Sequence, residues 1–195
     1  IFIYWQLTRG TGIRQHQFPE KGTKANFWIF MKPGKHGSTD KRLKLTDMED
    51  TRFMHCNIKT LNLLVNVMAA EKAEEAGCGE CVFHRGDIVT ECAHSNVSII
   101  KDGVFKTHPA DHYILPGITR MHLIQLCKDN GIPVDQTPLT MQELMYADEV
   151  IVSSSTKFCA PACEMNGTPI GGKAPELVKL LQEKYIEKFE AETKG

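Results

Sequence analysis

The chain has 195 residues, charges of mixed sign and a formal net charge of −1, so its composition gives no sign of a nucleic-acid partner or of an anionic membrane surface. No apolar run approaches the roughly 20 residues that a membrane helix needs, and no signal peptide is apparent. We therefore expect a cytoplasmic protein without membrane association, long enough to form a sizeable core.

Strands dominate the first half of the chain. Residues 1–9 already have the apolar and aromatic composition of a strand, which suggests that the chain begins within a domain, as a fragment or after loss of an N-terminal portion. Further strands are predicted over 25–32, 42–53 and 81–91, the last of which folds back at 85–87. A hairpin about Asp102 and Gly103 follows, because Asp-Gly between alternating apolar residues is a strong turn signal.

Helices are predicted over 60–76, 118–130, 140–146 and 175–191, and Gly77 and Gly131 close the first two. Hairpins followed by helices indicate an α+β fold rather than a regular βαβ repeat.

Seven cysteines, an odd number, lie in a chain without secretory features, which favours free thiols. Cys78 and Cys81 could join Cys159 and Cys163 in a zinc site. Against such a site, the first pair lies where a predicted helix ends and a strand begins, and the second lies in a segment that we expect to be irregular. We therefore predict no metal site.

Lys59 directly precedes the predicted helix over 60–76. A cation at a helix N-terminus is electrostatically unfavourable, and the apolar character of this helix through Met68 predicts burial. Both effects would lower the pKa of the ammonium and make the amine nucleophilic, as a Schiff base with an aldehyde cofactor or a carbonyl substrate requires. The alternative is a lysine whose stem lies on apolar surface while its ammonium reaches water.

Glu91 ends a predicted strand, and His94, Ser95 and Asn96 lead into the next one. If Glu91 is buried there, its carboxylate needs a cationic or N–H partner, which a pyridinium nitrogen would provide. A solvated carboxylate in a polar turn is the alternative.

Two segments suit a phosphate group. Gly117 precedes the helix predicted over 118–130, where the free N–H groups of Ile118 and Thr119 form an anion site. A strand beginning at Glu149 runs into four consecutive hydroxyl side chains, Ser153 to Thr156, which suit phosphate oxygens. An ordinary helix terminus and an exposed hydroxyl-rich turn are the alternatives.

Arg14 and His16 follow the first strand and are two residues apart. In an extended segment both side chains point the same way, so a guanidinium and an imidazole could bind one carboxylate together. A solvated basic loop is the alternative.

Together these segments resemble the class IV, or fold type IV, pyridoxal-phosphate aminotransferases, most closely those that act on D-amino acids such as D-alanine. The segments that carry the resemblance are IKTLNLL, VTECAHSN, ILPGITR, VIVSSSTK and TRGTGIRQHQFP, and it extends over nearly the whole chain. It implies the large C-terminal cofactor-binding domain of that fold, a strand-rich pseudo-barrel with flanking helices, and pyridoxal 5′-phosphate as the cofactor.

The resemblance implies a role for each candidate residue. Lys59 would form the Schiff base and move the proton between the substrate Cα and the cofactor, while Glu91 would bind the pyridine nitrogen and Leu115 would pack on the ring. Four residues would hold the phosphate: Ile118, Thr119, Ser154 and Ser155. Arg14 and His16 would bind the substrate α-carboxylate, and this pair favours D-amino-acid enzymes over branched-chain ones.

Two departures from the family pattern stand out. Cys92, Ala93 and His94 stand where the D-amino-acid enzymes tend to have a serine-rich run, which removes hydroxyls near the cofactor. No part of the chain corresponds to the family's small N-terminal domain. We therefore expect residues 1–20 to be the end of a small-domain strand with the interdomain segment, and residues 21–195 to be the cofactor-binding domain.

The resulting hypothesis is a homodimeric transaminase that moves an amino group between a D-amino acid and a 2-oxo acid such as 2-oxoglutarate by a ping-pong mechanism. A branched-chain L-amino-acid aminotransferase and an aminodeoxychorismate lyase are alternatives with the same fold. An inactive truncated chain, which binds the cofactor weakly or only associates with partners, is an alternative of another class.

Overall fold

The computed structural model describes residues 1–34 and 41–193. The described residues up to 34 belong to one compact unit and those from 41 onward to another. The domain boundary expected near residue 20 stays a prediction.

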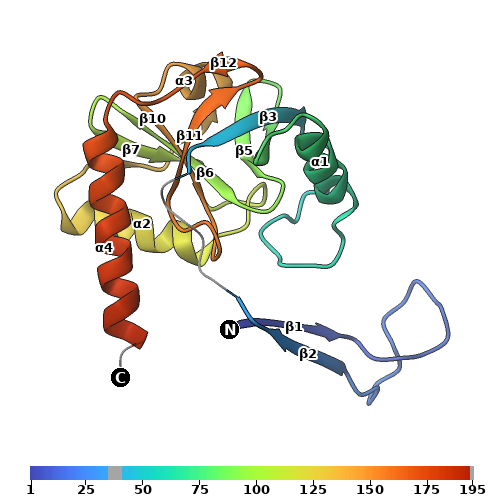
Figure 1. The fold of residues 1–195 in the computed structure, drawn as a ribbon. Helices are drawn as coiled ribbons and strands as arrows, with labels where there is room; N and C mark the ends of the chain where they lie inside the picture. Colours follow the sequence, from blue (N-terminus) through green and yellow to red (C-terminus); the bar gives the residue numbers. More distant parts are fainter. Residues whose placement is uncertain (35–40, 194–195) are drawn as a thin grey trace. The chain divides into compact units, whose positions relative to one another are not determined.

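The first unit is a β-hairpin (Figure 1). Strand β1 (Phe2–Thr8) pairs antiparallel with β2 (Asn26–Lys32), with Phe2 opposite Lys32 and Thr8 opposite Asn26, which confirms both predicted strands. A two-stranded hairpin cannot bury apolar side chains on both of its faces. Within this unit, large apolar side chains are accordingly exposed on both strands: Ile3, Trp5, Leu7, Phe27, Trp28, Ile29, Phe30 and Met31.

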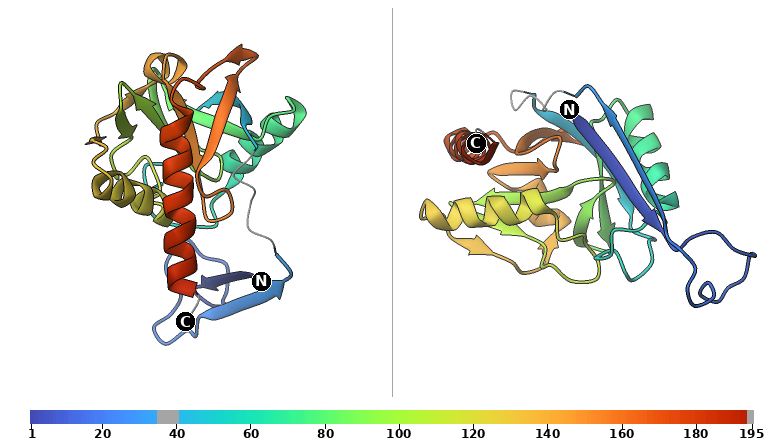
Figure 2. Two further views of the ribbon diagram at one scale, coloured as in Figure 1. Left: turned by 60° about the vertical axis from the view of Figure 1, so that its left-hand side comes forward. Right: turned by 90° about the horizontal axis from the view of Figure 1, so that it is seen from below.

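The second unit is built on a ten-stranded mixed sheet (Figures 1 and 2). Its strands follow one another in the order β8 (Val134–Asp135), β7 (Val104–Thr107), β6 (Asn96–Lys101), β10 (Glu149–Ser153), β11 (Ala160–Met165), β3 (Leu43–Glu49), β4 (Glu80–Arg85), β5 (Ile88–Cys92) and β9 (Leu139–Thr140), and β12 (Thr168–Pro169) pairs with β11. β3 runs parallel to β11 and to β4, and β7 runs parallel to β8, whereas the other pairs are antiparallel.

The predicted hairpin between β6 and β7 is confirmed. Lys101 pairs with Val104, and the two residues between them, Asp102 and Gly103, have φ angles of 48° and 77°. Two successive left-handed residues suit the right-handed twist of the flanking strands, which explains why Asp-Gly occupies this turn.

In residues 41–193, four helices flank the sheet: α1 (Leu64–Glu75), α2 (Ile118–Asp129), α3 (Met141–Met145) and α4 (Pro175–Thr193). α1 packs against β3 and β4, whereas α4 packs against α2 and β10. The views in Figure 2 separate these two groups of helices. The sheet with its flanking helices agrees with the predicted α+β class.

The core consists of side chains on both faces of the central strands. In β6 and β10, Ile99 and Val150 belong to one cluster while Ile100 and Ile151 belong to another that includes residues of α2 and α4. Because successive strand residues point to opposite faces, these strands are covered on both sides.

The segment after the hydroxyl run is a strand, not the irregular segment that was predicted. Residues 160–165 form β11 between β10 and β3, with Cys159 buried just before it and Cys163 within it. Small residues and a proline give this segment little strand propensity of its own, so its conformation depends on the two neighbouring strands. The short strands β8, β9 and β12 were not predicted either.

No helix in the described ranges is long and apolar enough to cross a membrane. Among residues 1–34 and 41–193, no group of three or more His, Cys, Asp or Glu side chains could hold a metal ion. All seven cysteines are free thiols.

Candidate functional site

Glu91 is buried at the end of β5, with 6% of its surface exposed. Its Oε2 accepts hydrogen bonds from the Leu115 N–H at 3.0 Å and from Asn96 Nδ2 at 3.1 Å, and its Oε1 accepts one from Arg52 Nη1 at 2.6 Å. Burial raises the pKa of Glu91 to about 7, even though Arg52 and the Leu115 N–H act to lower it. The predicted site therefore has a buried carboxyl that protein donors hold in one orientation.

Asn96 connects Glu91 to the start of α2. Its Nδ2 also donates to the Leu115 carbonyl at 2.9 Å. A Cβ placed on Gly117 would lie 2.2 Å from Asn96 Oδ1, which is too close for any side chain. Only glycine therefore allows the backbone to approach Asn96 in this way. Glu91, Leu115 and the N-terminus of α2 thus lie side by side, as the sequence predicted for a cofactor site.

The N-terminus of α2 is suited to an anion. Gly117 is the N-cap and has no side chain to accept from the N–H groups of the first turn, which include those of Ile118 and Thr119. Arg120, also in the first turn, is 2% exposed. It donates to three neutral oxygens, Thr107 Oγ1, the His108 carbonyl and Gln136 Oε1.

A buried hydroxyl without a hydrogen-bond partner is a second feature that suits an anion. Ser153 is paired with Asn96 in the sheet, is 1% exposed, and its Oγ has no partner in the described part of the chain. An unpartnered buried polar group is costly unless a ligand or water satisfies it. The free backbone donors of α2 and this hydroxyl fit the phosphate of pyridoxal phosphate.

The two serines predicted to bind phosphate lie in the turn after β10. Ser154 is half-buried, and its Oγ lies 3.3 Å from the Thr156 hydroxyl and accepts from the Lys157 N–H, whereas Ser155 is exposed. Their role stays a prediction. Ser153, one residue earlier, was not singled out, because a strand residue within a hydroxyl run carries no sign of its own burial.

His94, which stands where the family tends to have a serine, binds a second buried carboxylate. Glu80 accepts from Lys157 Nζ at 2.8 Å and from Ser95 Oγ at 2.8 Å, and His94 Nδ1 lies 3.2 Å from its Oε1. Burial alone would raise the pKa of Glu80, but hydrogen bonds and charge from His94 and Lys157 lower it to about 2. These contacts join the turn after Glu91 to the hydroxyl turn after β10.

Lys59 does not lie at the start of a buried helix, as was predicted. α1 begins at Leu64 rather than at residue 60, so Lys59 precedes the helix by a loop, and Lys59 itself is exposed. The helix is also not buried within its unit, since Leu64 is 70% and Met68 is 56% exposed. The sequence pattern was misread because an apolar helix face can be left open to a partner as well as closed over a core.

The loop that carries Lys59 nevertheless lies beside the Glu91 site. The Cys56 N–H donates to the His112 carbonyl at 2.9 Å, and Asn66 Nδ2 in α1 donates to the Ala93 carbonyl at 2.7 Å. These two anchors bracket Lys59 and attach its segment to Ala93, two residues after Glu91, and to His112, three residues before Leu115. Its chemical role stays a prediction.

Arg14 and His16 lie in the first unit, on the loop between β1 and β2, and both are exposed. The chain bends at Ile13 and again at His16, so this loop is not a regular extended strand. The assignment of these residues to the substrate carboxylate stays a prediction.

Arg52 is a second residue of this site that the sequence did not indicate. It lies 39 positions before Glu91 and donates to that carboxylate from a segment that belongs to no regular element. A single arginine among mixed charges gives no sequence signal, and only the sheet brings it to Glu91.

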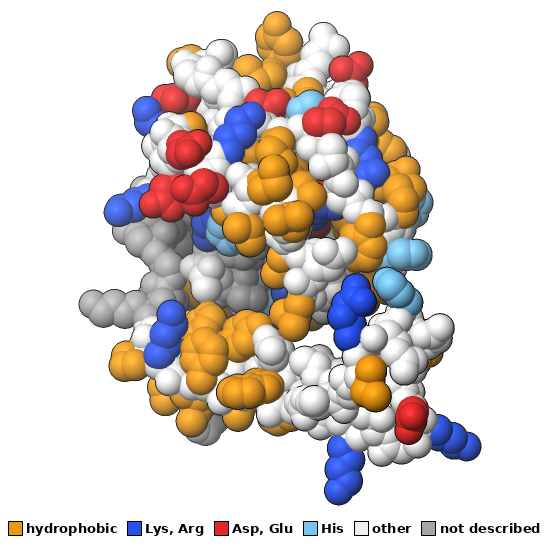
Figure 3. Space-filling model, turned by 90° about the vertical axis from the view of Figure 1, so that its right-hand side faces the viewer, with side chains coloured by type: hydrophobic (Ala, Val, Ile, Leu, Met, Phe, Trp, Pro, Cys, Tyr) orange, Lys and Arg blue, Asp and Glu red, His pale blue; other side chains and the backbone are white. Residues whose placement is uncertain are grey.

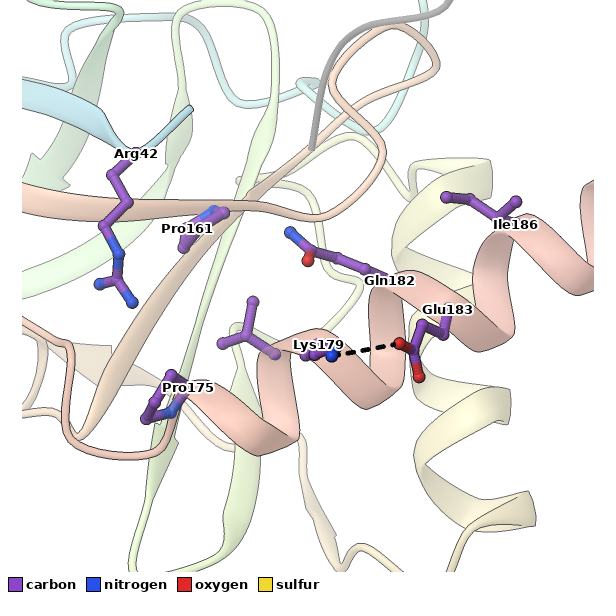
Figure 4. A pocket seen from close by; sticks show the side chains of 8 residues that line it. Arg42, Pro161, Pro175, Lys179, Gln182, Glu183 and Ile186 are labelled. Atoms are coloured by element: carbon purple, nitrogen blue, oxygen red, sulfur yellow. Dashed lines mark ion pairs between the residues drawn. The ribbon is translucent and has the colours of Figure 1, made fainter. Parts of the chain in front are cut away.

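A separate pocket lies between α4 and β11 (Figure 4). Pro161 and Arg42 line one side and α4 lines the other, where Lys179 forms an ion pair with Glu183 at 3.8 Å. None of the predicted site residues lines it, so we assign it no role.

Comparison with known proteins agrees with this geometry. The family model described as amino-transferase class IV matches residues 2–165. D-alanine aminotransferase of Staphylococcus haemolyticus is 41% identical over 191 residues, which covers 95% of this chain and 68% of that protein.

Two solved structures show the same fold. A fold IV transaminase from Curtobacterium pusillum has a TM-score of 0.79 at 21% identity, with coverage of 93% of this chain and 63% of that one. The branched-chain amino acid aminotransferase of Escherichia coli has a TM-score of 0.76 at 23% identity, with coverage of 95% and 64%. The chain spans about two thirds of the length of the curated relatives that it matches.

Proposed function

Because this chain belongs to the class IV aminotransferases, which depend on pyridoxal phosphate, we propose that it takes part in transferring an amino group between a D-amino acid, such as D-alanine, and a 2-oxo acid, such as 2-oxoglutarate. Identity of 41% to a D-alanine aminotransferase supports D-amino acids as substrates. Similarity to a branched-chain enzyme at 23% identity supports the fold alone.

The observation that carries the proposal is the buried Glu91 carboxyl next to the N-terminus of α2. Pyridoxal phosphate, when bound, supplies an aldehyde that condenses with amino groups and a ring that accepts electrons. Glu91 would hold the proton on the ring nitrogen. The Ile118 and Thr119 N–H groups would bind the phosphate together with hydroxyls of Ser153, Ser154 and Ser155.

The remaining residues would act on the substrate and at the other end of the ring. Lys59 would hold the cofactor through its aldehyde carbon. Once the amino group of the substrate takes its place there, the released and unprotonated Lys59 amine would carry a proton to and from the substrate Cα. Leu115 would pack on one face of the ring. Arg14 and His16 would bind the α-carboxylate of the substrate.

The first test concerns Lys59. Purified protein mixed with pyridoxal phosphate should develop the visible absorbance of a lysine-bound cofactor, and Lys59→Ala should abolish it because Lys59 is the amine proposed to bind the aldehyde. Lys128→Ala, which changes an exposed lysine at the end of α2, serves as the matched control and should keep the spectrum. An unchanged spectrum for Lys59→Ala would take Lys59 out of the site.

The second part of the test concerns the substrate. Transfer to 2-oxoglutarate should be faster from D-alanine than from L-leucine. The reverse preference would favour a branched-chain enzyme, and release of pyruvate from aminodeoxychorismate would favour the lyase. Cofactor binding without any transfer would favour the inactive-chain alternative.

We further propose a homodimer in the cytoplasm. Support for the dimer comes from a cluster of exposed apolar side chains on α1 and the loop before it, here called the α1 patch: Phe53, Met54, Ile58, Leu61, Leu63, Leu64, Val67 and Met68. Figure 3 shows apolar side chains gathered on this side of the second unit. Contiguous apolar surface of this kind is typical of a protein interface. The cytoplasmic location stays a prediction.

A further inference from the structure

The Arg52 guanidinium is held by hydrogen bonds on two edges and by an aromatic ring on one face. Its Nε and Nη2 donate to the two oxygens of Asp50, each at 2.9 Å, and its Nη2 also donates to the Tyr113 carbonyl at 3.2 Å. The guanidinium lies over the Phe83 ring, 4.4 Å from its centre. With these groups occupied, Nη1 is directed at Glu91 Oε1, at 2.6 Å. A planar guanidinium bound on two edges and on one face has a single orientation.

Asp50 is in turn fixed from several sides. It is 4% exposed, and its Oδ2 accepts from the Thr90 hydroxyl at 2.9 Å and lies 3.4 Å from Arg85 Nε. Burial would raise the pKa of Asp50, but hydrogen bonds and charge from Arg52 together with the Thr90 hydroxyl lower it. Asp50 is therefore an anion that orients Arg52 and does not compete with Glu91 for protons.

We propose that Arg52 is a positioning residue of the cofactor site, which orients the Glu91 carboxyl and favours its ionised form, so that Glu91 can hold the proton on the ring nitrogen of the cofactor. The proposal deepens the proposed function and rests on it. Among the described residues, Glu91 Oε2 has two donors and Oε1 has only Arg52, which leaves Oε1 one acceptor position for the ring N–H.

The charges around Glu91 explain why such a residue is needed. Four titratable or charged groups interact with it: Arg52, Asp50 and the thiols of Cys56 and Cys92, whereas Arg85 contacts Asp50. Burial raises the pKa of Glu91 to about 7 even with Arg52 present, so loss of this cation would leave the carboxyl protonated at neutral pH. A neutral carboxyl has no negative charge with which to stabilise a protonated ring nitrogen. Arg52 thus acts through Glu91 without touching the cofactor.

The test measures the Glu91 carboxyl directly in cofactor-free protein. Glutamate labelled with ¹³C at Cδ gives one carboxyl signal for each residue, and the Glu91 signal is the one missing from Glu91→Gln. The titration should give a pKa near 7 in the unsubstituted protein. In Arg52→Gln it should be higher by about 1–3 pH units, the usual effect of an adjacent opposite charge. An unchanged Glu91 pKa would overturn the proposal.

Arg85→Gln is the matched control, because Arg85 is a cation of the same cluster that contacts Asp50 rather than Glu91. It should move the Glu91 pKa much less than Arg52→Gln does. If Arg52→Gln does not fold because Asp50 is left unpaired, Asp50→Asn is compared with the double variant Asp50→Asn/Arg52→Gln, in which both buried charges are removed. The double variant should still have the higher Glu91 pKa, and equal values would overturn the proposal.

A second measurement gives the affinity for pyridoxal phosphate by equilibrium dialysis at pH 7.5. Arg52→Gln should weaken binding at least about tenfold, equivalent to roughly 1.4 kcal/mol, but should have little further effect in a Glu91→Gln background. Equal weakening in both backgrounds would mean that Arg52 does not act through Glu91. The titration of Glu91 needs no cofactor, so its outcome is independent of the Lys59 test. Failure of the Lys59 test alone overturns the proposed function. An unchanged Glu91 pKa alone overturns the role of Arg52.

Discussion

Asn96 is the side chain on which the geometry of the candidate site most depends. One amide group donates to Glu91 and to the Leu115 carbonyl, and its oxygen lies against Gly117. The carboxyl that would bind the ring nitrogen and the helix end that would bind the phosphate therefore both lie against one residue. A displacement of Asn96 should affect both.

Gly117→Ala tests this dependence. The added Cβ would lie 2.2 Å from Asn96 Oδ1, and Asn96 is buried, so the side chain or the start of α2 must move. Overpacking of this kind typically costs about 1–3 kcal/mol, and we expect that loss in urea unfolding together with weaker cofactor binding. Gly12→Ala is the control, since its Cβ meets nothing within 4 Å. Stability and affinity equal to those of the unsubstituted protein would mean that Asn96 adjusts freely.

Local sequence signals predicted some elements closely and others poorly. α2 and the hairpin between β6 and β7 were located well because Gly131 and Asp102-Gly103 mark their ends by backbone conformations that few other residues adopt. The start of α1 was placed too early, since the apolar run before Leu64 continues the helical pattern without a capping residue. An element boundary could therefore be predicted where a residue with a distinctive backbone conformation marks it, and not where such a residue is missing.

The exposed face of α1 leads to a prediction at the same scale. If the α1 patch is a dimer interface, Met68→Glu should place a charge within it and raise the dimer dissociation constant by on the order of tenfold to a hundredfold, since burying a methionine side chain contributes about 1.5–3 kcal/mol. Sedimentation equilibrium measures this constant. Ile186→Glu, a comparable change on α4, should leave it unchanged. A dimer that is indifferent to Met68→Glu would move the interface elsewhere.

At the scale of the whole molecule, the pH dependence of stability should reflect Glu80. Its pKa of about 2 in the folded chain lies below the ordinary value of 4.5, so its ion pairs stabilise the fold above pH 4.5, and that contribution is lost as the pH falls from 4.5 to about 2. Lys157→Met should therefore lower the free energy of unfolding by about 2 kcal/mol at pH 7. The difference in this free energy between the variant and the unsubstituted protein should shrink toward pH 2.

Urea unfolding between pH 2 and pH 7 measures this difference. Lys179→Met, at a lysine that is 75% exposed, is the matched control and should change stability by less than about 0.5 kcal/mol at every pH. A cost for Lys157→Met that is the same at all pH values would show that Lys157 contributes through packing rather than through the Glu80 carboxylate.

The sequence predicted the α+β class and most elements because these follow from local patterns. Glu91, Leu115 and Gly117 were assigned to one site through the family resemblance. The sequence did not predict Arg52 as the partner of Glu91 or the burial of Ser153, because both depend on strands that meet across the sheet. It also missed β11, whose strand conformation is imposed by its neighbours.

The position of β11 has a consequence for how the chain acquires its fold. In the described residues, backbone pairing passes from the β3-β4-β5-β9 group to the β8-β7-β6-β10 group through β11. A chain emerging from the ribosome can form its local hairpins early, but the two groups become one sheet only after residues 160–165 have been synthesised. Pairing between segments so distant in sequence is slow, so β11 is the element whose docking should limit the folding rate.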